Sequence, residues 1–217
     1  MNRLLEGLPP SDQERAARLL AGSPAIEIDG GVPYFPRTFA DAALLVVEDG
    51  FVVLRATFPP LARSVVTFDA GPGAIFLPPG SDEVLCGLGK SRATAISAAA
   101  RDQLLAVPVV AQRIVEQLSL ALGQRQESIA NFAPPRHIER VRRKLLQLGR
   151  GYGRVVRDGI RIDFPISHAL LAEMIGSSRE TVTRALDELQ RTGFVARVGS
   201  TYRLLVPPQA VLAAAQP

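Results

Sequence analysis

Cysteine and histidine are scarce in this sequence: one Cys and two His occur among its 217 residues. A single cysteine excludes an intramolecular disulfide, a zinc knuckle and an iron–sulfur cluster held by four thiolates. Both histidines, His137 and His168, lie in the second half of the chain, so we expect neither a haem nor a metal site in the first half. We expect Cys86 to pack as a small buried hydrophobe; the alternative is a lone redox thiol.

Long hydrophobic runs are also missing. No segment reaches the roughly 18 apolar residues that span a bilayer, and the first twenty residues lack the apolar core of a signal peptide. We therefore expect a cytoplasmic protein with no membrane partner. The sequence has no H-E-x-x-H motif, no P-loop and no evident Cys/His or Ser/His/Asp set, so we do not expect an enzyme.

A group of basic residues stands out in a chain whose net charge is only +4. Between Arg136 and Arg161 there are nine Lys or Arg residues and two acids, Glu139 and Asp158. Such a cluster favours a polyanionic partner. The alternative is a solvated helix face followed by a loop.

The pattern of residues 25–107 is typical of many short strands. Apolar runs such as AALLVV, FVVLRATF, AIFL and QLLAVP alternate with turn signals such as Asp29-Gly30-Gly31 and Glu48-Asp49-Gly50. This spacing predicts an all-β barrel or jelly roll. Ahead of it, Ser11-Asp12-Gln13-Glu14 predicts a capping box and a short helix that ends near Leu20.

A long helix is predicted next, because about 25 residues from Val109 contain no proline and one glycine, Gly123. One small domain has difficulty burying a helix of this length. We expect it to pair with a second copy of itself; the alternative is a helix that lies on its own β domain. One stripe along it, apolar except for Arg125, has mixed three- and four-residue spacing: Val110, Ile114, Leu118, Ala121, Leu122, Arg125 and Ile129.

Pro134-Pro135 ends the long helix. After it we predict a basic helix at 136–149, a loop at 149–158 and a short strand in RIDFP, residues 161–165.

A helix-turn-helix is predicted from the next residues. Ser167 stands where it can cap a short helix at about 168–175. Gly176 tolerates the left-handed geometry of a helix end, and Ser177 is expected to cap the following helix, which begins near Ser178. Two helices joined by a short turn with glycine are typical of DNA-binding proteins.

The segments FVARV and TYRLLV, joined by Gly-Ser, predict a β-hairpin directly after the second helix. Such a hairpin is a wing. The order of elements predicts a winged-helix domain at about 135–207, whose second helix lies in the DNA major groove.

The second helix presents a polar ridge opposite its apolar face. Arg179 and Arg184 suit guanine O6 and N7, and Glu180 suits cytosine N4, so we predict that these three side chains read bases. Ser178 and Thr181 carry short hydroxyls that suit phosphate groups. The alternative is that Glu180 only closes a capping box and pairs with Arg184.

These motifs resemble the CRP/FNR family of bacterial transcription regulators. The most specific part is ISHALLAEMIGSSRETVTRALDELQRTGFV, and GGVPYFPRTFADAALLVVEDGFVVLR with VVTFDAGPGAIF resembles the family's cyclic-nucleotide-binding roll. The resemblance implies an α+β fold in three parts. They are a cyclic-nucleotide-binding-like effector β-roll (jelly roll) at 1–108, a dimerisation helix at 109–133 and a winged helix-turn-helix DNA-binding domain at 134–217.

The resemblance implies a regulator that binds double-stranded DNA as a homodimer through the 109–133 helix and contacts RNA polymerase. In members with an R-E-T-V-x-R helix, the two arginines and the glutamate read a TGTGA-like half-site of a palindrome; here they are Arg179, Glu180 and Arg184. Phosphate contacts of the family match Ser167, Ser178 and Thr181.

The two positions after Ser167 are often polar or basic in relatives and are His168 and Ala169 here, which predicts at least one weaker backbone contact.

The effector pocket implied by the resemblance is where this sequence departs from the family. Phe76-Leu77-Pro78-Pro79 replaces a Gly-Glu pair, Ala93 replaces a hydroxyl residue after the phosphate arginine, and Arg125-Gln126 replaces a Thr-Ser pair. We therefore expect an effector other than cyclic AMP, either a nucleotide or another small anion, or no effector. Arg92 stands at the position of the family's phosphate-binding arginine. The alternative is that Arg92 is a strand residue that forms a salt bridge with Glu83. The candidate pocket residues are Glu83, Arg92, Ala93, Thr94, Arg125 and Gln126.

A second class of function also fits these features: a ligand-binding or protein-interaction module that keeps a vestigial winged helix. Such a module would show no salt-dependent binding to a TGTGA palindrome.

Overall fold

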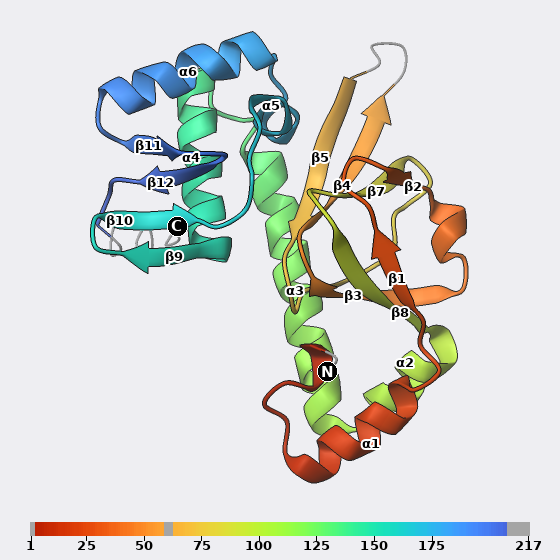
Figure 1. Ribbon diagram of the computed structural model, residues 1–217. Helices are drawn as coiled ribbons and strands as arrows, with labels where there is room; N and C mark the ends of the chain where they lie inside the picture. The colour runs from red at the N-terminus through yellow and green to blue at the C-terminus, as the bar shows by residue number, and fades with distance from the viewer. Residues whose placement is uncertain (1–2, 59–62, 208–217) are drawn as a thin grey trace. The chain divides into compact units, whose positions relative to one another are not determined.

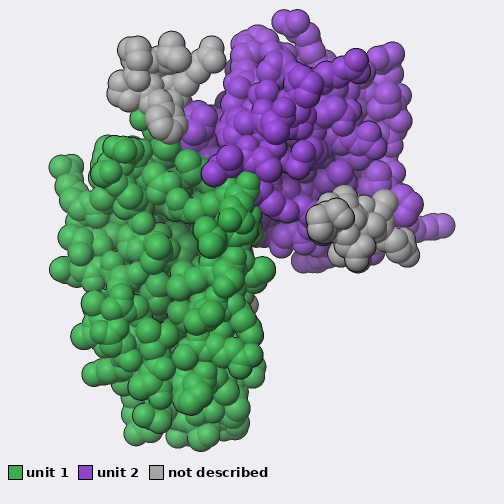
Figure 2. Space-filling view, turned by 180° about the vertical axis from the view of Figure 1, so that it is seen from behind, with its two compact units in different colours: residues 1–62, 67–126 green, residues 63–66, 127–217 purple. Residues whose placement is uncertain are grey.

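The computed structural model describes residues 3–58 and 63–207. The chain forms two compact units, residues 1–62 with 67–126 and residues 63–66 with 127–217 (Figure 2). Helices and antiparallel sheets occur in both units, so the predicted α+β class is confirmed. The outer ends of the first and last predicted domains lie outside the described residues.

The first unit is built on a β-roll of two antiparallel sheets (Figure 1). One sheet has the order β1-β8-β3-β6 and the other β2-β7-β4-β5. The strands are β1 (Ala25–Ile28), β2 (Pro33–Tyr34), β3 (Ala42–Asp49), β4 (Val52–Phe58), β5 (Arg63–Ala70), β6 (Ile75–Phe76), β7 (Glu83–Gly87) and β8 (Ser91–Ser97). The strand-rich pattern of the sequence therefore predicted this region correctly.

Strand β3 lies at the centre of the packing. Leu45 and Val47 belong to a buried cluster that joins side chains of both sheets. Leu44 and Val46 belong to a second cluster, formed with the helices. Since successive side chains of a strand point to opposite faces, this run of four buried residues requires a cover on each face.

Helices cover the face of β3 that carries Leu44 and Val46. They are η1 (Arg3–Leu5), α1 (Pro10–Leu20), α2 (Ala98–Leu105) and the first part of α3 (Pro108–Ala130), whereas η2 (Pro36–Phe39) lies between β2 and β3. Leu20, Leu104, Val110 and Ile114 pack against the sheet from these helices.

Two local predictions in this unit were wrong. Ser11 does not cap α1: the N-cap is Pro9, two residues earlier, without a side-chain hydrogen bond, and Pro10 occupies the first turn of the helix. The run QLLAVP is not a strand either. It contains the end of α2, which Ser97 caps by accepting a hydrogen bond from the amide of Ala100.

Helix α3 spans 23 residues, close to the predicted length. Its first part packs in the roll through Val110 and Ile114. Within residues 3–58 and 63–207 no single helix is long and apolar enough to cross a membrane; α2 and α3 meet that criterion only as a pair, bent by 117° at their break.

The second unit contains a four-stranded antiparallel sheet of order β11-β12-β10-β9 and, in its described part, three helices that begin and end within it (Figure 1). Its core includes Leu145, Ile162, Leu171, Leu186 and Tyr202. The elements are α4 (His137–Tyr152), β9 (Gly153–Val156), β10 (Gly159–Ile162), α5 (His168–Ile175), α6 (Arg179–Arg191), β11 (Val195–Val198) and β12 (Thr201–Leu204).

The predicted loop at 149–158 was wrong. Helix α4 continues to Tyr152, and β9 then pairs with β10. Two of the glycines that suggested a loop, Gly149 and Gly153, serve close packing instead: a Cβ on Gly149 would lie 2.6 Å from a methyl carbon of Leu204, and one on Gly153 would meet Ile160.

Candidate functional site

The joint between α5 and α6 has the predicted geometry. The Ser167 hydroxyl accepts a hydrogen bond from the amide of Leu170 at 3.0 Å. Gly176 is left-handed, with φ 61° and ψ 47°, and the amide of Ser177 donates to the carbonyl of Ala172 at 2.9 Å. A Cβ on Gly176 would also lie 2.5 Å from the Phe132 ring. Glycine is therefore required here by the backbone and by the space around it.

The cap of α6 is one residue later than predicted. The Ser178 hydroxyl, not that of Ser177, accepts from the amide of Thr181 at 3.2 Å. The Ser177 hydroxyl instead forms a hydrogen bond with Nδ1 of His137 at 3.1 Å. Because the turn uses both Gly176 and Ser177, the helix begins at Arg179.

Helix α6 has one buried and one exposed face, as its periodicity predicted. Val182, Ala185, Leu186 and Leu189 are buried. The predicted base readers Arg179, Glu180 and Arg184 are exposed on the opposite side. The pKa of Glu180 is lowered by hydrogen bonds from its own backbone amide and from the Ser178 hydroxyl, with a smaller contribution from the two arginines. This carboxylate is therefore ionised at neutral pH and is an acceptor only.

A hollow of about 380 Å³ lies beside the start of α6. The N-terminal residues of α5 line it together with Arg179 and with Arg197 of β11. The sequence analysis pointed to Ser167, His168 and Ala169 as positions of backbone contacts and to Arg179 as a base reader. It did not indicate Arg197; the signal for that residue was the predicted hairpin, which returns the wing toward the helices.

The basic segment 136–161 is not one free cationic face. Six of its cations have partners in their own unit: Arg140 with the carbonyl of Pro134 (2.6 Å), Arg142 with the Phe194 ring (4.9 Å to the centroid), Lys144 with Gln147 (3.1 Å), Arg150 with Glu127 (3.0 Å), and Arg154 and Arg161 with Asp163 (3.2 and 2.5 Å). The charge count alone therefore overstates what this segment offers to a polyanion.

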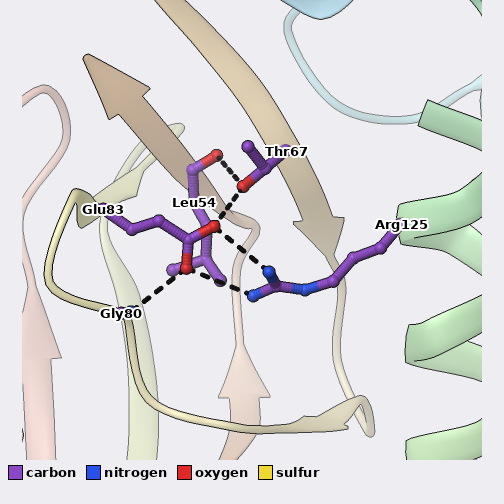
Figure 3. Close-up of polar contacts among 5 residues, drawn as sticks. All are labelled: Leu54, Thr67, Gly80, Glu83 and Arg125. Carbon is purple, nitrogen blue, oxygen red and sulfur yellow. Dashed lines mark hydrogen bonds and ion pairs between the residues drawn. The ribbon is translucent and has the colours of Figure 1, made fainter. Parts of the chain in front are cut away.

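In the roll, Glu83 and Arg125 form an ion pair (Figure 3). The two guanidinium nitrogens lie 3.2 and 3.3 Å from the two carboxylate oxygens. Glu83 also accepts from the Thr67 hydroxyl at 2.6 Å and from the Gly80 amide at 3.1 Å. The Arg125 guanidinium lies 5.6 Å from the centroid of the Phe68 ring. Burial raises the pKa of Glu83, but the hydrogen bonds from Thr67 and Gly80 and the charge of Arg125 outweigh it, so the pKa is lowered.

The other predicted pocket residues do not join this pair. Arg92 lies on β8, in the other sheet, where its side chain is exposed and its cross-strand neighbours are Glu27 and Asp49. The alternative of an Arg92–Glu83 salt bridge is therefore wrong, since Glu83 pairs with Arg125.

The remaining pocket candidates are also separated. Ala93 is buried in the core between the sheets. The Thr94 hydroxyl donates to Glu48 at 2.7 Å, and Gln126 is exposed. The roll thus brings together Glu83 and Arg125 of the six predicted residues.

Cys86 is buried in β7, as its interpretation as a small hydrophobe predicts. Among the described residues no group of three or more His, Cys, Asp and Glu side chains could hold a metal ion.

A β-roll, a long helix and a winged helix follow one another in that order along the chain. Residues 139–213 match the model of the Crp-like helix-turn-helix domain. The chain is 37% identical over 93 residues to the global nitrogen regulator of Synechococcus elongatus; the match covers 43% of this chain and 42% of that protein. The aligned part thus spans less than half of that relative.

Solved structures share the fold over nearly the whole chain. A CooA mutant from Carboxydothermus hydrogenoformans has a TM-score of 0.72 at 17% identity, covering 92% of this chain and 90% of its own. The c-di-GMP responsive global regulator CLP of Xanthomonas campestris has a TM-score of 0.66 at 22% identity, covering 92% and 100%.

The resemblance to the CRP/FNR family is therefore confirmed: this chain has a Crp-like helix-turn-helix domain and the fold of the family's regulators. The relatives are named as regulators and not as enzymes.

Proposed function

We propose that this chain is a sequence-specific transcription regulator that binds double-stranded DNA. The observation that carries the proposal is the exposed ridge of Arg179, Glu180 and Arg184 at the start of a helix whose other face is buried. A helix presented in this way fits the major groove with its N-terminal residues against base edges. Two arginines and an ionised glutamate suit guanine and cytosine respectively, which accords with a TGTGA-like half-site.

Ser167, Ser178 and Thr181 are the proposed phosphate contacts. In the free protein the hydroxyls of Ser167 and Ser178 accept hydrogen bonds from helix amides. The Ser167 hydroxyl, which accepts in this way, still has its own hydrogen to donate to a phosphate oxygen, whereas the Ser178 hydroxyl must turn its hydrogen from the Glu180 carboxylate to the phosphate. Such contacts would position the protein on DNA without reading its sequence.

We propose a homodimer formed through α3. Val115, Leu122 and Ile129 are 58%, 59% and 72% exposed, and they recur every seven residues. A seven-residue apolar repeat is the pattern of two helices that pack along each other.

We further propose that residues 1–108 form an effector roll, residues 109–133 a dimer helix and residues 134–217 a DNA-binding domain. Contact with RNA polymerase is proposed from the family resemblance alone.

Cyclic AMP is not the proposed effector. Glu83 presents a carboxylate in the roll, and the guanidinium of Arg125 already binds it at two points. A cyclic phosphate placed at Arg125 would have to break this pair and face the uncovered carboxylate, which repels it, and the other candidate for the phosphate, Arg92, is exposed in the other sheet. Isothermal titration with cyclic AMP, cyclic GMP and cyclic di-GMP tests this directly. Heat of binding with cyclic AMP would contradict the proposal.

The proposed function is tested by titrating the 217-residue chain into a labelled TGTGA palindrome and into a scrambled duplex of the same composition. We expect tighter binding to the palindrome, with an affinity that falls steeply as salt rises because cationic side chains release counterions. Equal affinity for both duplexes would mean that the protein binds DNA without sequence specificity. Binding to neither would favour the ligand-binding or interaction module.

A further inference from the structure

The hollow beside α6 has a cationic lining drawn from three elements. Arg179 begins α6, Arg197 lies on wing strand β11, and Ser167, His168 and Ala169 are at the start of α5. None of these lining residues, all in the described part of the chain, is acidic. Two guanidinium groups with fixed charge and the amino end of a helix make a site that favours an anion.

The wing arginine is held at the edge of the hollow. Its Nε donates to the carbonyl of Gly199 at 3.1 Å, across the tip of the hairpin. Gly199 is left-handed, with φ 62°, as the tight turn between β11 and β12 requires. The terminal nitrogens of Arg197 are not used by this bond, so they can meet a phosphate oxygen.

His168 is held in one tautomer by Thr183. The Thr183 hydroxyl donates to the carbonyl of Arg179 at 2.9 Å. Nδ1 of His168 lies 2.8 Å from the same hydroxyl oxygen. When the hydroxyl hydrogen lies on the carbonyl, Nδ1 carries the proton and donates. Nε2 is then the nitrogen that gains a proton when the ring becomes charged.

The charges around His168 come from two neighbouring elements. Partial burial is the largest contribution and lowers the pKa of His168. Arg197 of the wing and Arg179 of α6 also disfavour the imidazolium, and Asp187 of α6 favours it; together these effects leave the pKa lowered. A phosphate bound beside Arg197 would offset the repulsion from that guanidinium and favour the charged ring.

We propose that this hollow binds one phosphate group of the DNA backbone, and that His168 takes up a proton from solvent on Nε2 as the phosphate binds. The inference rests on the proposed DNA-binding function and adds the wing arginine and the histidine to its contacts. Tighter binding at lower pH follows, because the bound state holds one more proton per subunit than the free state.

The test uses two features of the chain: it has only two histidines, and the other one, His137, provides a matched control. Affinity for the palindrome is measured from pH 7.5 to 5.5 with wild-type protein, His168→Gln and His137→Gln. We expect wild-type affinity to rise by roughly three- to tenfold per half-site as the pH falls, because one proton per subunit is taken up on binding. His168→Gln should lose this rise and His137→Gln should keep it. A rise that survives in His168→Gln overturns the inference.

Arg197→Ala tests the phosphate contact itself. It should weaken binding to the palindrome and the scrambled duplex alike and reduce the salt slope by about 0.9 per subunit. Arg15→Ala, an exposed arginine of α1, should leave both unchanged. If Arg197→Ala binds DNA with the wild-type salt slope, the phosphate site is wrong although the proposed function stands. If the wild-type protein binds no duplex, the proposed function fails first.

Histidine NMR separates DNA from other phosphate sources without relying on a variant's fold. With ¹³C-labelled histidine the protein gives two ring resonances, assigned through His137→Gln. We expect the titration midpoint of His168 to move to higher pH on adding duplex and to move little with inorganic phosphate at the same phosphate concentration. An unchanged midpoint with bound DNA overturns the inference. An equal shift with inorganic phosphate overturns the assignment to the DNA backbone.

Discussion

Glu83 on β7 and Arg125 on α3 are 42 positions apart in the chain, and their side chains meet in a two-point ion pair. The Glu83 side chain is 13% exposed and that of Arg125 is 35% exposed. The pair thus ties the long helix to the roll through a largely covered carboxylate. Four hydrogen bonds converge on this carboxylate, from Thr67, Gly80 and both ends of the guanidinium fork.

Removing only the cation should destabilise the roll. Arg125→Met keeps much of the aliphatic stem and leaves the Glu83 carboxylate without its counter-charge, so we expect a loss of about 1–2 kcal/mol in the free energy of unfolding, discounted for the exposure of Arg125. Chemical denaturation measures it. The control is Arg101→Met, which breaks an exposed pair with Asp102 and should cost less than about 0.5 kcal/mol. Equal costs for both variants would contradict a stabilising role for the Glu83–Arg125 pair.

Lowering the pH should remove the stabilisation that the Glu83 carboxylate provides. The pKa of Glu83 is lower in the folded protein than its ordinary value of 4.5, so its stabilisation is present above that value and is lost as pH falls through the folded pKa. In Glu83→Gln this component is missing. We expect the difference in unfolding free energy between wild type and Glu83→Gln to shrink as pH is lowered from 6 to 3, roughly the range of carboxyl titration. A constant or growing difference would contradict the assignment.

The left-handed turn before α6 should tolerate no side chain. Gly176→Ala places a Cβ at positive φ and against the Phe132 ring, and we expect a loss of about 2–4 kcal/mol. Gly193 has a similar φ, +72°, but a Cβ added there would meet open space out to 4 Å. Gly193→Ala should therefore cost only the backbone term, about 1–2 kcal/mol. Thermal unfolding of both variants separates the contact with Phe132 from the conformational cost.

Charge placed on the apolar repeat of α3 should prevent dimerisation. Leu122→Glu puts a carboxylate in the proposed interface, where an unpaired buried charge is strongly disfavoured. We expect a monomer in analytical ultracentrifugation and at least about a tenfold weaker affinity for the palindrome, because the two half-sites are no longer bound together. Leu120 is 61% exposed but lies outside the repeat, so Leu120→Glu should remain dimeric. If Leu122→Glu remains dimeric as Leu120→Glu does, the dimer interface does not lie on this repeat.

Local signals in the sequence predicted what neighbouring residues determine. The caps at Ser167 and Gly176 and the two faces of α6 depend on residues within one or two turns, and each was predicted. The cap of α6 was predicted at Ser177 and lies at Ser178, because the turn takes up both Gly176 and Ser177 before the helix begins.

Contacts between distant residues could not be predicted in this way. Glu83 pairs with Arg125 only because the fold places β7 beside α3, and the periodic pattern of either segment contains no information on that neighbour. Arg197 reaches the hollow because the wing returns to α5. Similarly, the packing of Gly149 against Leu204 concealed the end of α4.

The central claim is that α6 reads base pairs. The most direct measurement is the affinity of wild type and Arg184→Ala for a set of half-sites in which each base pair of TGTGA is changed in turn. We predict that Arg184→Ala binds the parent site more weakly by about 1–3 kcal/mol and loses discrimination at one base pair while keeping it at the others. A uniform loss on every duplex, the scrambled one included, would mean a phosphate contact only and would contradict the claim.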